Sequence, residues 1–209
     1  MKLNEALEAC GIIAILRGVS PDEVVAVSQA LYDAGIRIVE VPLNSPDPFT
    51  SIDKLAKAFA NKMVVGAGTV LSEADVNLLK EHGGEISVSP DCNPATIARA
   101  VALGLEPLPG VFTPTEAFSA IRAGAKHLKL FPAEAASPLT IKAWKAVLPK
   151  HVQVHAVGGV TPENMKDWLA AGASGFGIGS ALYKQGMPLS KISESAHSLV
   201  NAWKRAKGV

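Results

Sequence analysis

The sequence IIAILRGVSPDE, residues 12–23, sets a pattern that the rest of the chain repeats. Residues 12–16 form a short, apolar and mostly β-branched run, which is typical of a buried parallel strand. Residues 20–23 then combine a capping serine, a first-turn proline and a capping-box glutamate, which together predict the start of a helix. This helix is expected to end at Gly35, because glycine favours the left-handed conformation of a helix C-cap.

Strand-then-helix units of this kind follow one another eight times, at a spacing of roughly 22 to 25 residues. Such alternation indicates an α/β fold, and eight units at this length favour a closed (β/α)8 TIM barrel over a doubly wound sheet. Residues 17–20 also lack the glycine-rich fingerprint usual after the first strand of a doubly wound sheet. The fifth strand, residues 106–110, is the weakest because its two prolines remove sheet hydrogen bonds. We expect one barrel domain over residues 1–209 with a short N-terminal helix.

The composition argues against several classes of protein. The 209 residues are 48% hydrophobic with a formal net charge of +1, so they can build a large core but offer no strongly basic surface for nucleic acid. No run approaches the ~18 apolar residues of a membrane helix, and the N-terminal residues do not resemble a signal peptide. Cys10 and Cys92 form neither a disulfide framework nor a zinc pattern. We expect a cytoplasmic protein without nucleic-acid or membrane partners.

A lysine lies inside the sixth apolar run, HLKLFPAE at residues 127–134. Alternation along a strand places His127, Lys129 and Phe131 on one face. Burial disfavours the ammonium form, so this lysine either finds a partner or becomes a neutral amine that can form a Schiff base with a carbonyl substrate. The simpler alternative is a lysine that reaches from the strand edge to water.

Other polar residues follow the predicted strands at their carboxyl ends, where the active site of such a barrel lies. They are Arg17, Glu40, Asn44, Thr69, Ser89, Gly158, Gly159, Gly179 and Ser180. A carboxylate inside a strand is costly unless paired, so Glu40 is either an acid/base group or the structural ion-pair partner of Arg17 or Lys129. Arg17 could instead bind a substrate carboxylate or phosphate, and Thr69 either donates a hydrogen bond or is a turn residue.

Glycines close the last two predicted strands, where many barrels bind phosphate through backbone N–H groups and a short helix. The candidate phosphate contacts are Gly158, Gly159, Gly179 and Ser180, with residues 181–183 as the short helix. A glycine pair alone is ordinary turn chemistry, but two such pairs after the last two of eight strands are more specific.

The histidines do not form a metal site. His127 and His155 could face the barrel interior, but no carboxylate stands at ligand spacing beside either. We expect satisfied interior histidines, no metal and no cofactor.

Five motifs together resemble one family, the class I 2-keto-3-deoxy-6-phosphogluconate/6-phosphogalactonate aldolases. They are AILRG at 14–18, VEVPLNS at 39–45, GAGTV at 66–70, LKLFPA at 128–133 and AVGGVTPEN at 156–164. The likeness covers essentially the whole chain, in order. It implies a (β/α)8 barrel, a phosphorylated keto-deoxy sugar acid as substrate, and a homotrimer as the usual assembly.

The resemblance also implies a role for each candidate residue. Lys129 would be the Schiff-base lysine and Glu40 the general acid/base. Arg17 and Thr69 would contact the substrate carboxylate or hydroxyl groups. Apart from the resemblance, the position of Phe131 on the strand face of Lys129 predicts that it packs against the imine and excludes water. The phosphate would be bound by Gly158, Gly159, Gly179 and Ser180.

Residues 40–45 separate two branches of that family. The phosphogluconate enzymes typically read EVTLRT there, whereas this chain reads EVPLNS, which looks like the phosphogalactonate branch. The expected reaction is cleavage of 2-dehydro-3-deoxy-6-phosphogalactonate to pyruvate and D-glyceraldehyde 3-phosphate. The first alternative is that the protein cleaves the phosphogluconate isomer, or both stereoisomers. A less favoured alternative is a phosphate-binding barrel isomerase or a non-catalytic sugar-phosphate binder. Because residue 44 is asparagine and not the arginine of the phosphogluconate branch, Arg17 would have to bind the substrate carboxylate. His155 stands where a bulky apolar residue would be expected.

Overall fold

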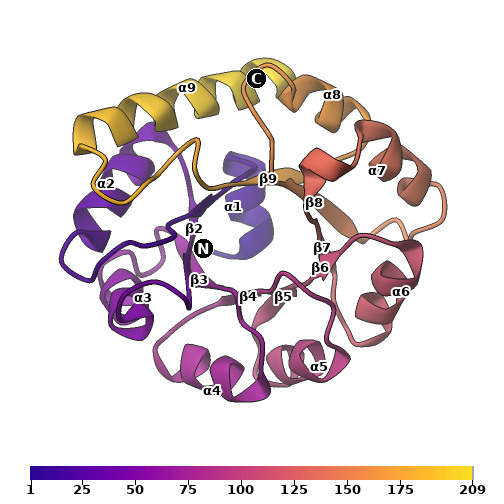
Figure 1. The fold of residues 1–209 in the computed structure, drawn as a ribbon, viewed down its shortest axis with the longest axis horizontal. Coiled ribbons are helices and arrows are strands. Elements are labelled where there is room, and N and C mark those ends of the chain that lie inside the picture. Colours follow the sequence, from indigo (N-terminus) through magenta and orange to yellow (C-terminus); the bar gives the residue numbers. More distant parts are fainter. Residues whose placement is uncertain (209) are drawn as a thin grey trace.

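The computed structural model describes residues 1–208 and shows strands surrounded by helices (Figure 1). The strands are β1 (Ile12–Ile15), β2 (Ile38–Pro42), β3 (Val64–Gly68), β4 (Ile86–Val88), β5 (Glu106–Leu108), β6 (Gly110–Val111), β7 (His127–Leu130), β8 (Gln153–Val157) and β9 (Gly175–Ile178). Their pairings are parallel throughout. The fold is the predicted TIM barrel, in which all carboxyl ends of the strands face one mouth.

The fifth barrel strand is interrupted at Pro109, between β5 and β6. The sheet order is β5-β4-β3-β2-β1-β9-β8-β7-β6, so the two halves of this strand stand at opposite ends of the hydrogen-bonded order. β5 pairs with β4, whereas the Pro109 carbonyl accepts the Lys129 N–H at 2.9 Å. The covalent chain therefore closes the barrel at the strand that its prolines were predicted to weaken.

Helices alternate with the strands, and all of those named below except α1 and the turn η1 lie around the outside of the barrel (Figure 1). They are α1 (Leu3–Ala9), α2 (Val24–Ala34), α3 (Pro48–Ala58), α4 (Glu73–Glu81), α5 (Pro94–Ala102), α6 (Pro114–Arg122), the 3-10 turn η1 (Ala133–Ala135), α7 (Pro138–Lys145), α8 (Met165–Ala170) and α9 (Leu189–Lys207). No helix within residues 1–208 is long and apolar enough to cross a membrane.

Two predicted helix starts differ from the structure. α2 begins at Val24, after a turn over residues 21–23. One half of the predicted capping box is formed, because the Ser20 N–H donates to the Glu23 carboxylate at 3.0 Å, whereas the Ser20 hydroxyl accepts no hydrogen bond within the described residues. Residues 181–183 do not form the predicted short helix; the N–H groups of Leu182 and Tyr183 both donate to the Gly179 carbonyl in a single turn.

The barrel interior is filled differently along its length. At the amino ends of the strands, an apolar cluster holds Leu3, Ala6 and Leu7 of α1 against strand residues. Those strand residues are Ile13, Ile38, Val64, Ile86, Val88 and Leu108. Figure 1 shows α1 within the ring of strands. A helix therefore closes the lower end, and the mouth at the other end is left for polar side chains.

Candidate active site

Lys129 is held inside the barrel by β7. Its backbone pairs with Gly110 of β6 on one side and with His155 of β8 on the other, and only 7% of the residue is exposed. Burial lowers the pKa of its ammonium group; the nearby Glu40 carboxylate opposes this shift and the Arg17 charge adds to it. The lysine does not reach water at a strand edge, and its environment favours the neutral amine.

Glu40, on β2, is the buried acid of the site. It is 2% exposed, and burial raises the pKa of its carboxyl to about 7, against the opposing charges of Lys129 and Arg17. Within the described residues its Oε2 has no hydrogen-bond partner. Gly68 of β3 makes room for it, because a Cβ there would overlap the Glu40 carboxylate. A carboxyl with a pKa near neutrality can both accept and donate a proton.

Lys129 and Glu40 line one small void inside the barrel, of about 10 Å3. In the described part of the chain, ion pairs within 4.0 Å join Lys54–Asp22, Lys57–Asp53 and Lys191–Glu194, all on the surface. Neither Lys129 nor Arg17 forms such a pair with Glu40. The structural ion pair considered for Glu40 is therefore not formed among the described residues.

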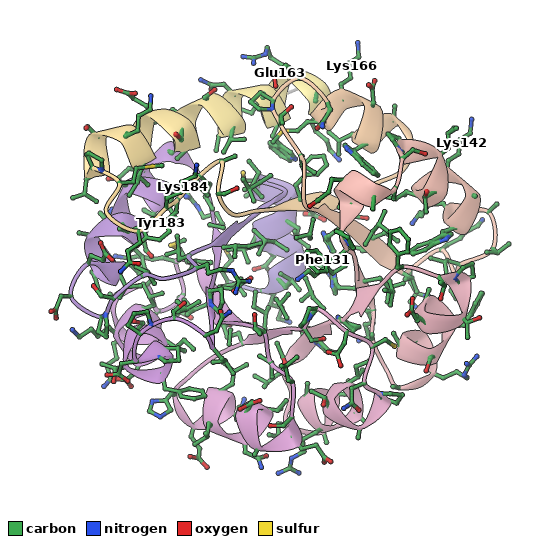
Figure 2. All side chains as sticks on the ribbon, viewed as in Figure 1. Phe131, Lys142, Glu163, Lys166, Tyr183 and Lys184 are labelled. Carbon is green, nitrogen blue, oxygen red and sulfur yellow. The ribbon has the colours of Figure 1, made fainter. Side chains whose placement is uncertain are left out.

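The predicted phosphate and substrate residues meet above this void. One pocket of about 360 Å3 is lined by Arg17, Phe131, Gly158, Gly159, Gly179 and Ser180. Phe131 lies near the middle of the ring of strands, whereas Lys142 and Lys166 extend from the outer helices (Figure 2). The Lys129 Nζ lies 4.5 Å from the centre of the Phe131 ring, so this ring covers the lysine from the mouth side.

Among the predicted substrate contacts, Thr69 is the one that lines neither cavity. It follows β3 in a left-handed conformation, with φ of +56°, which is uncommon for a β-branched residue. The residue therefore belongs to the turn at the end of β3, and its substrate contact stays a prediction.

The loops after β1 and β2 are joined by two hydrogen bonds. Arg17 Nη1 donates to Asn44 Oδ1 at 2.5 Å, and the Gly18 N–H donates to the Ser45 hydroxyl oxygen at 3.0 Å. Asn44 therefore orients the guanidinium of Arg17 at the edge of the mouth. The sequence named both residues but contained no signal that they touch, because they are 27 residues apart.

The glycines after β8 adopt conformations that other residues rarely take. Gly158 and Gly159 have φ of +105° and +67°, and a Cβ on Gly158 would overlap the Glu134 carboxylate. Asn164 donates from its amide to the Gly159 carbonyl at 2.9 Å. Sequence reasoning missed Glu134 and Asn164 as parts of this loop. Both lie inside or beside quoted motifs, but no spacing rule connects residues that meet between neighbouring loops.

His127 and His155 both face the barrel interior, as predicted, but the expectation of satisfied histidines is wrong for His155, whose buried Nδ1 has no hydrogen-bond partner within the described residues. His127 is 3% exposed and His155 is fully buried, and the His127 Nδ1 lies 3.1 Å from the His155 Nε2. Burial lowers the pKa of the two imidazoles to about 4 and about 3, with smaller effects from Lys126 on His127 and from His127 on His155. Both rings are therefore neutral at neutral pH.

A buried lysine and a buried carboxyl at the mouth of a parallel barrel are side chains of the kind that Schiff-base chemistry on a carbonyl compound uses. The chain belongs to the KDPG and KHG aldolase family, which it matches over residues 3–194. It is accordingly an aldolase, a carbon–carbon lyase.

Several known proteins are similar over most of their length. The chain is 46% identical, over 195 residues, to the 2-dehydro-3-deoxy-6-phosphogalactonate aldolase of Escherichia coli (strain K12), covering 93% of this chain and 95% of that one. It is 31% identical over 151 residues to the KHG/KDPG aldolase of the same organism, covering 71% and 70%. A solved structure described as native KDPGal superposes with a TM-score of 0.93 at 45% identity, covering 95% of this chain and 96% of that one.

Proposed function

We propose that the protein cleaves 2-dehydro-3-deoxy-6-phosphogalactonate to pyruvate and D-glyceraldehyde 3-phosphate through a Schiff base on Lys129. One observation carries this proposal: a buried lysine with a lowered pKa shares a void with a buried carboxyl whose pKa is raised to about 7. Lowering the pKa of the lysine makes more of the neutral amine nucleophile available, and a carboxyl with a pKa of about 7 can carry protons near neutral pH.

Formation of the Schiff base begins when the neutral Nζ of Lys129 attacks the C2 ketone. Glu40 gives a proton to the developing alkoxide, takes one back from the attached nitrogen and gives it to the departing hydroxyl, so that water leaves and a protonated imine remains. Each transfer uses a carboxyl that is close to half-protonated near pH 7. Phe131 covers the lysine from the mouth side and limits access of water to the imine.

Cleavage of the C3–C4 bond follows from the electron-accepting imine. Ionised Glu40 removes the C4 hydroxyl proton, the C3–C4 electron pair moves into an enamine, and the aldehyde leaves. The enamine takes a proton at C3 from Glu40, and water hydrolyses the imine to release pyruvate and regenerate Lys129. The steps balance without an external oxidant or cofactor.

The substrate is held at both ends in this proposal. Arg17, oriented by Asn44, contacts the carboxylate, and Thr69 contacts the carboxylate or a hydroxyl group. The phosphate lies in the pocket lined by Gly158, Gly159, Gly179 and Ser180. The identity to the E. coli phosphogalactonate enzyme and the EVPLNS motif favour the galacto isomer. The phosphogluconate isomer remains the second candidate, because a relative named for KDPG is 31% identical.

Comparing the two stereoisomers tests this proposal. Pyruvate release from each phosphorylated substrate is measured for the wild type, Lys129→Ala and Lys166→Ala. The wild type should prefer the galacto isomer, Lys129→Ala should release no pyruvate, and Lys166→Ala, changed on the outer helix α8, should match the wild type. Residual turnover by Lys129→Ala would reject the Schiff-base mechanism, and preference for the gluco isomer would reject the substrate assignment alone.

We also propose that the protein assembles as a homotrimer. Large apolar side chains are exposed on consecutive helices and their flanking loops, among them Leu139 (70%), Val147 (61%) and Phe112 (42%). Exposed apolar surface of this kind is typical of contacts between subunits. Light scattering coupled to size-exclusion chromatography should give three times the 21.7 kDa chain mass; a monomer or dimer would reject the trimer.

A further inference from the structure

Residues 179–187 lie between β9 and α9 and begin with the glycine and serine predicted to bind phosphate. Inside this segment, the N–H groups of Leu182 and Tyr183 donate to the Gly179 carbonyl at 2.8 and 3.0 Å, so its first turn is held together by its own backbone. In the described part of the chain, one hydrogen bond joins the segment to the rest of the protein. The Tyr183 hydroxyl donates to Glu23 Oε1 at 3.0 Å, across 160 residues of sequence.

The Glu23 carboxylate binds two loops at once. The oxygen that accepts the Tyr183 hydroxyl, Oε1, also accepts the Ser20 N–H at 3.0 Å. Ser20 lies at the end of the loop after β1, which carries Arg17. Hydrogen bonds to a carboxylate are stronger than those to a neutral acceptor. A single charged oxygen therefore connects the loop that carries Arg17 with the turn that begins at Gly179.

The two loops face each other across the mouth. A pocket of about 410 Å3 is lined by residues of both, among them Arg17, Ser180 and Tyr183. Arg17 and Ser180 also line the neighbouring pocket that contains the other predicted phosphate residues. The loops approach closely, since a Cβ on Gly18 would lie 3.6 Å from the Gln185 Oε1. A shift of either loop therefore changes the distance between Arg17 and the turn after β9.

Tyr183 is suited to hold this distance. The residue is 3% exposed, the preceding Leu182 is fully buried, and Figure 2 shows Tyr183 on the side of the barrel where α2 lies. Burial and the Glu23 carboxylate raise the pKa of the Tyr183 hydroxyl, so it keeps its proton and remains a donor. A buried tyrosine hydroxyl needs a partner, but any carbonyl would satisfy it. The partner here is instead the carboxylate that also binds the Arg17 loop.

We propose that Glu23 and Tyr183 are positioning residues that fix the distance between Arg17 and the phosphate-binding turn. The enzyme thereby selects substrates that carry a carboxylate and a phosphate at the correct separation. This inference rests on the proposed function, in which Arg17 contacts the carboxylate and Gly179 and Ser180 contact the phosphate. A molecule bound at both ends gains affinity only when both sites are in register, whereas a molecule bound at one end does not depend on the distance.

The loops keep their own shapes when this bond is removed. Arg17 is still held by Asn44, and the Gly18 N–H still donates to Ser45, both in the loop after β2. The turn after β9 keeps its two backbone bonds to the Gly179 carbonyl. Loss of the Tyr183–Glu23 bond therefore moves the turn relative to Arg17 without unfolding either site.

Four variants test the proposal. Tyr183→Phe removes one oxygen atom and keeps the ring. Glu23→Ala removes the acceptor, whereas Glu23→Gln keeps an amide oxygen that can accept both bonds. Tyr32→Phe is the matched control, because Tyr32 is the other tyrosine of the chain and packs on Phe59 at a ring distance of 6.1 Å on the outer helices. Circular dichroism and thermal unfolding establish that each variant is folded.

Three ligands are compared in each variant. They are the full phosphorylated substrate, measured by KM and kcat; pyruvate, by the concentration that gives half-maximal borohydride trapping; and inorganic phosphate, by its inhibition constant. We expect Tyr183→Phe and Glu23→Ala to raise the KM of the full substrate by roughly tenfold, the effect of one hydrogen bond to a charged group, with kcat nearly unchanged. The constants for pyruvate and for phosphate should stay at the wild-type values. Glu23→Gln and Tyr32→Phe should resemble the wild type.

The double variant Glu23→Ala/Tyr183→Phe should be no worse than Glu23→Ala, because both changes remove the same bond. An unchanged KM in folded Tyr183→Phe, or a loss of thermal stability alone, would overturn the positioning role. Equal weakening of phosphate and full substrate would overturn it too, since the bond would then shape the phosphate site itself. If Tyr183→Phe does not fold, the contrast between Glu23→Ala and Glu23→Gln decides. Absence of a trapped pyruvate adduct in the wild type would be a separate failure, that of the proposed function.

Discussion

The two ends of the barrel differ in how their buried groups are satisfied. At the lower end, Leu3 and Leu7 of α1 pack on apolar strand residues. At the mouth, Glu40 is buried with an unpartnered oxygen beside a lysine that has no ion-pair partner within the described residues. Buried carboxyl and amine groups of this kind cost stability, and their altered pKa values are what proton transfer needs. Apolar packing at the lower end therefore stabilises the fold, whereas the buried ionisable groups at the mouth lower the free energy of unfolding.

Glu40→Gln tests this comparison at its strongest point. Cleavage should be lost, yet the protein should become more stable at pH 8. The folded pKa is raised from 4.5 to about 7, so the native state holds its proton longer than the unfolded state, and stability falls as pH rises through this range. Removing the charge should raise the free energy of unfolding at pH 8 by up to about 3 kcal/mol and leave it nearly unchanged at pH 4. Urea unfolding at both pH values measures this.

The opposite result would break the comparison. If Glu40→Gln were less stable than the wild type at pH 8, the carboxylate would be a stabilising group and the mouth would not differ from the lower end.

Gly68→Ala should change the position of the Glu40 carboxyl but not its chemical identity. The added Cβ overlaps the Glu40 carboxylate and should move it away from the lysine, lowering the cleavage rate on the order of 100-fold. Gly66→Ala, two residues earlier on β3, is the contrast, because its Cβ meets the Ile86 backbone and should mainly lower thermal stability. Turnover per folded molecule and thermal unfolding separate the two. Wild-type turnover in Gly68→Ala would contradict the role given to this glycine.

Leu7→Ala sharpens the comparison from the lower end. Leu7 is 6% exposed and packs inside the barrel cluster, so its truncation should cost about 2 to 3 kcal/mol of unfolding free energy. The turnover number of the folded protein should stay at the wild-type value, since α1 does not reach the mouth. Denaturant titration and steady-state kinetics on the same sample measure both; a large fall in turnover would show that the two ends are coupled.

Asn44→Ala should have the smallest effect. It releases the Arg17 guanidinium and should raise KM threefold to tenfold, the effect of about 1 kcal/mol from one hydrogen bond, with little change in kcat. Asn77→Ala is a close match, because Asn77 accepts a 2.7 Å hydrogen bond from Arg99 on the outer helices. That variant should leave KM unchanged. The same rise in KM for both would mean that Arg17 is not specifically positioned for substrate.

Most of the fold could be predicted from local patterns. The alternation of apolar runs with capped helices located the barrel strands, and Gly35 ends α2 in the expected left-handed conformation, with φ of +110°. The start of α2 differs because residues 21–23 form a turn before the first helical residue, although the Glu23 side chain binds the Ser20 N–H as a capping box predicts. Local signals therefore locate an element well but fix its first residue less well.

The candidate site was only partly predictable. Lys129 and Glu40 stand out because a charged residue inside an apolar strand is unusual in any sequence. Three other contacts join residues from separate strands or loops. They are the close approach of Gly68 to Glu40, the Arg17–Asn44 hydrogen bond and the His127–His155 contact. Such contacts depend on register and side-chain direction, which no spacing along the chain reveals.

The most direct test of the central claim is the intact mass of the protein after incubation with pyruvate and borohydride, followed by peptide mapping. A neutral Lys129 beside Glu40 predicts one stable pyruvyl adduct, located on Lys129 and absent from Lys129→Ala. No adduct on a folded sample, or an adduct on another lysine, would contradict the account and return Lys129 to a structural role.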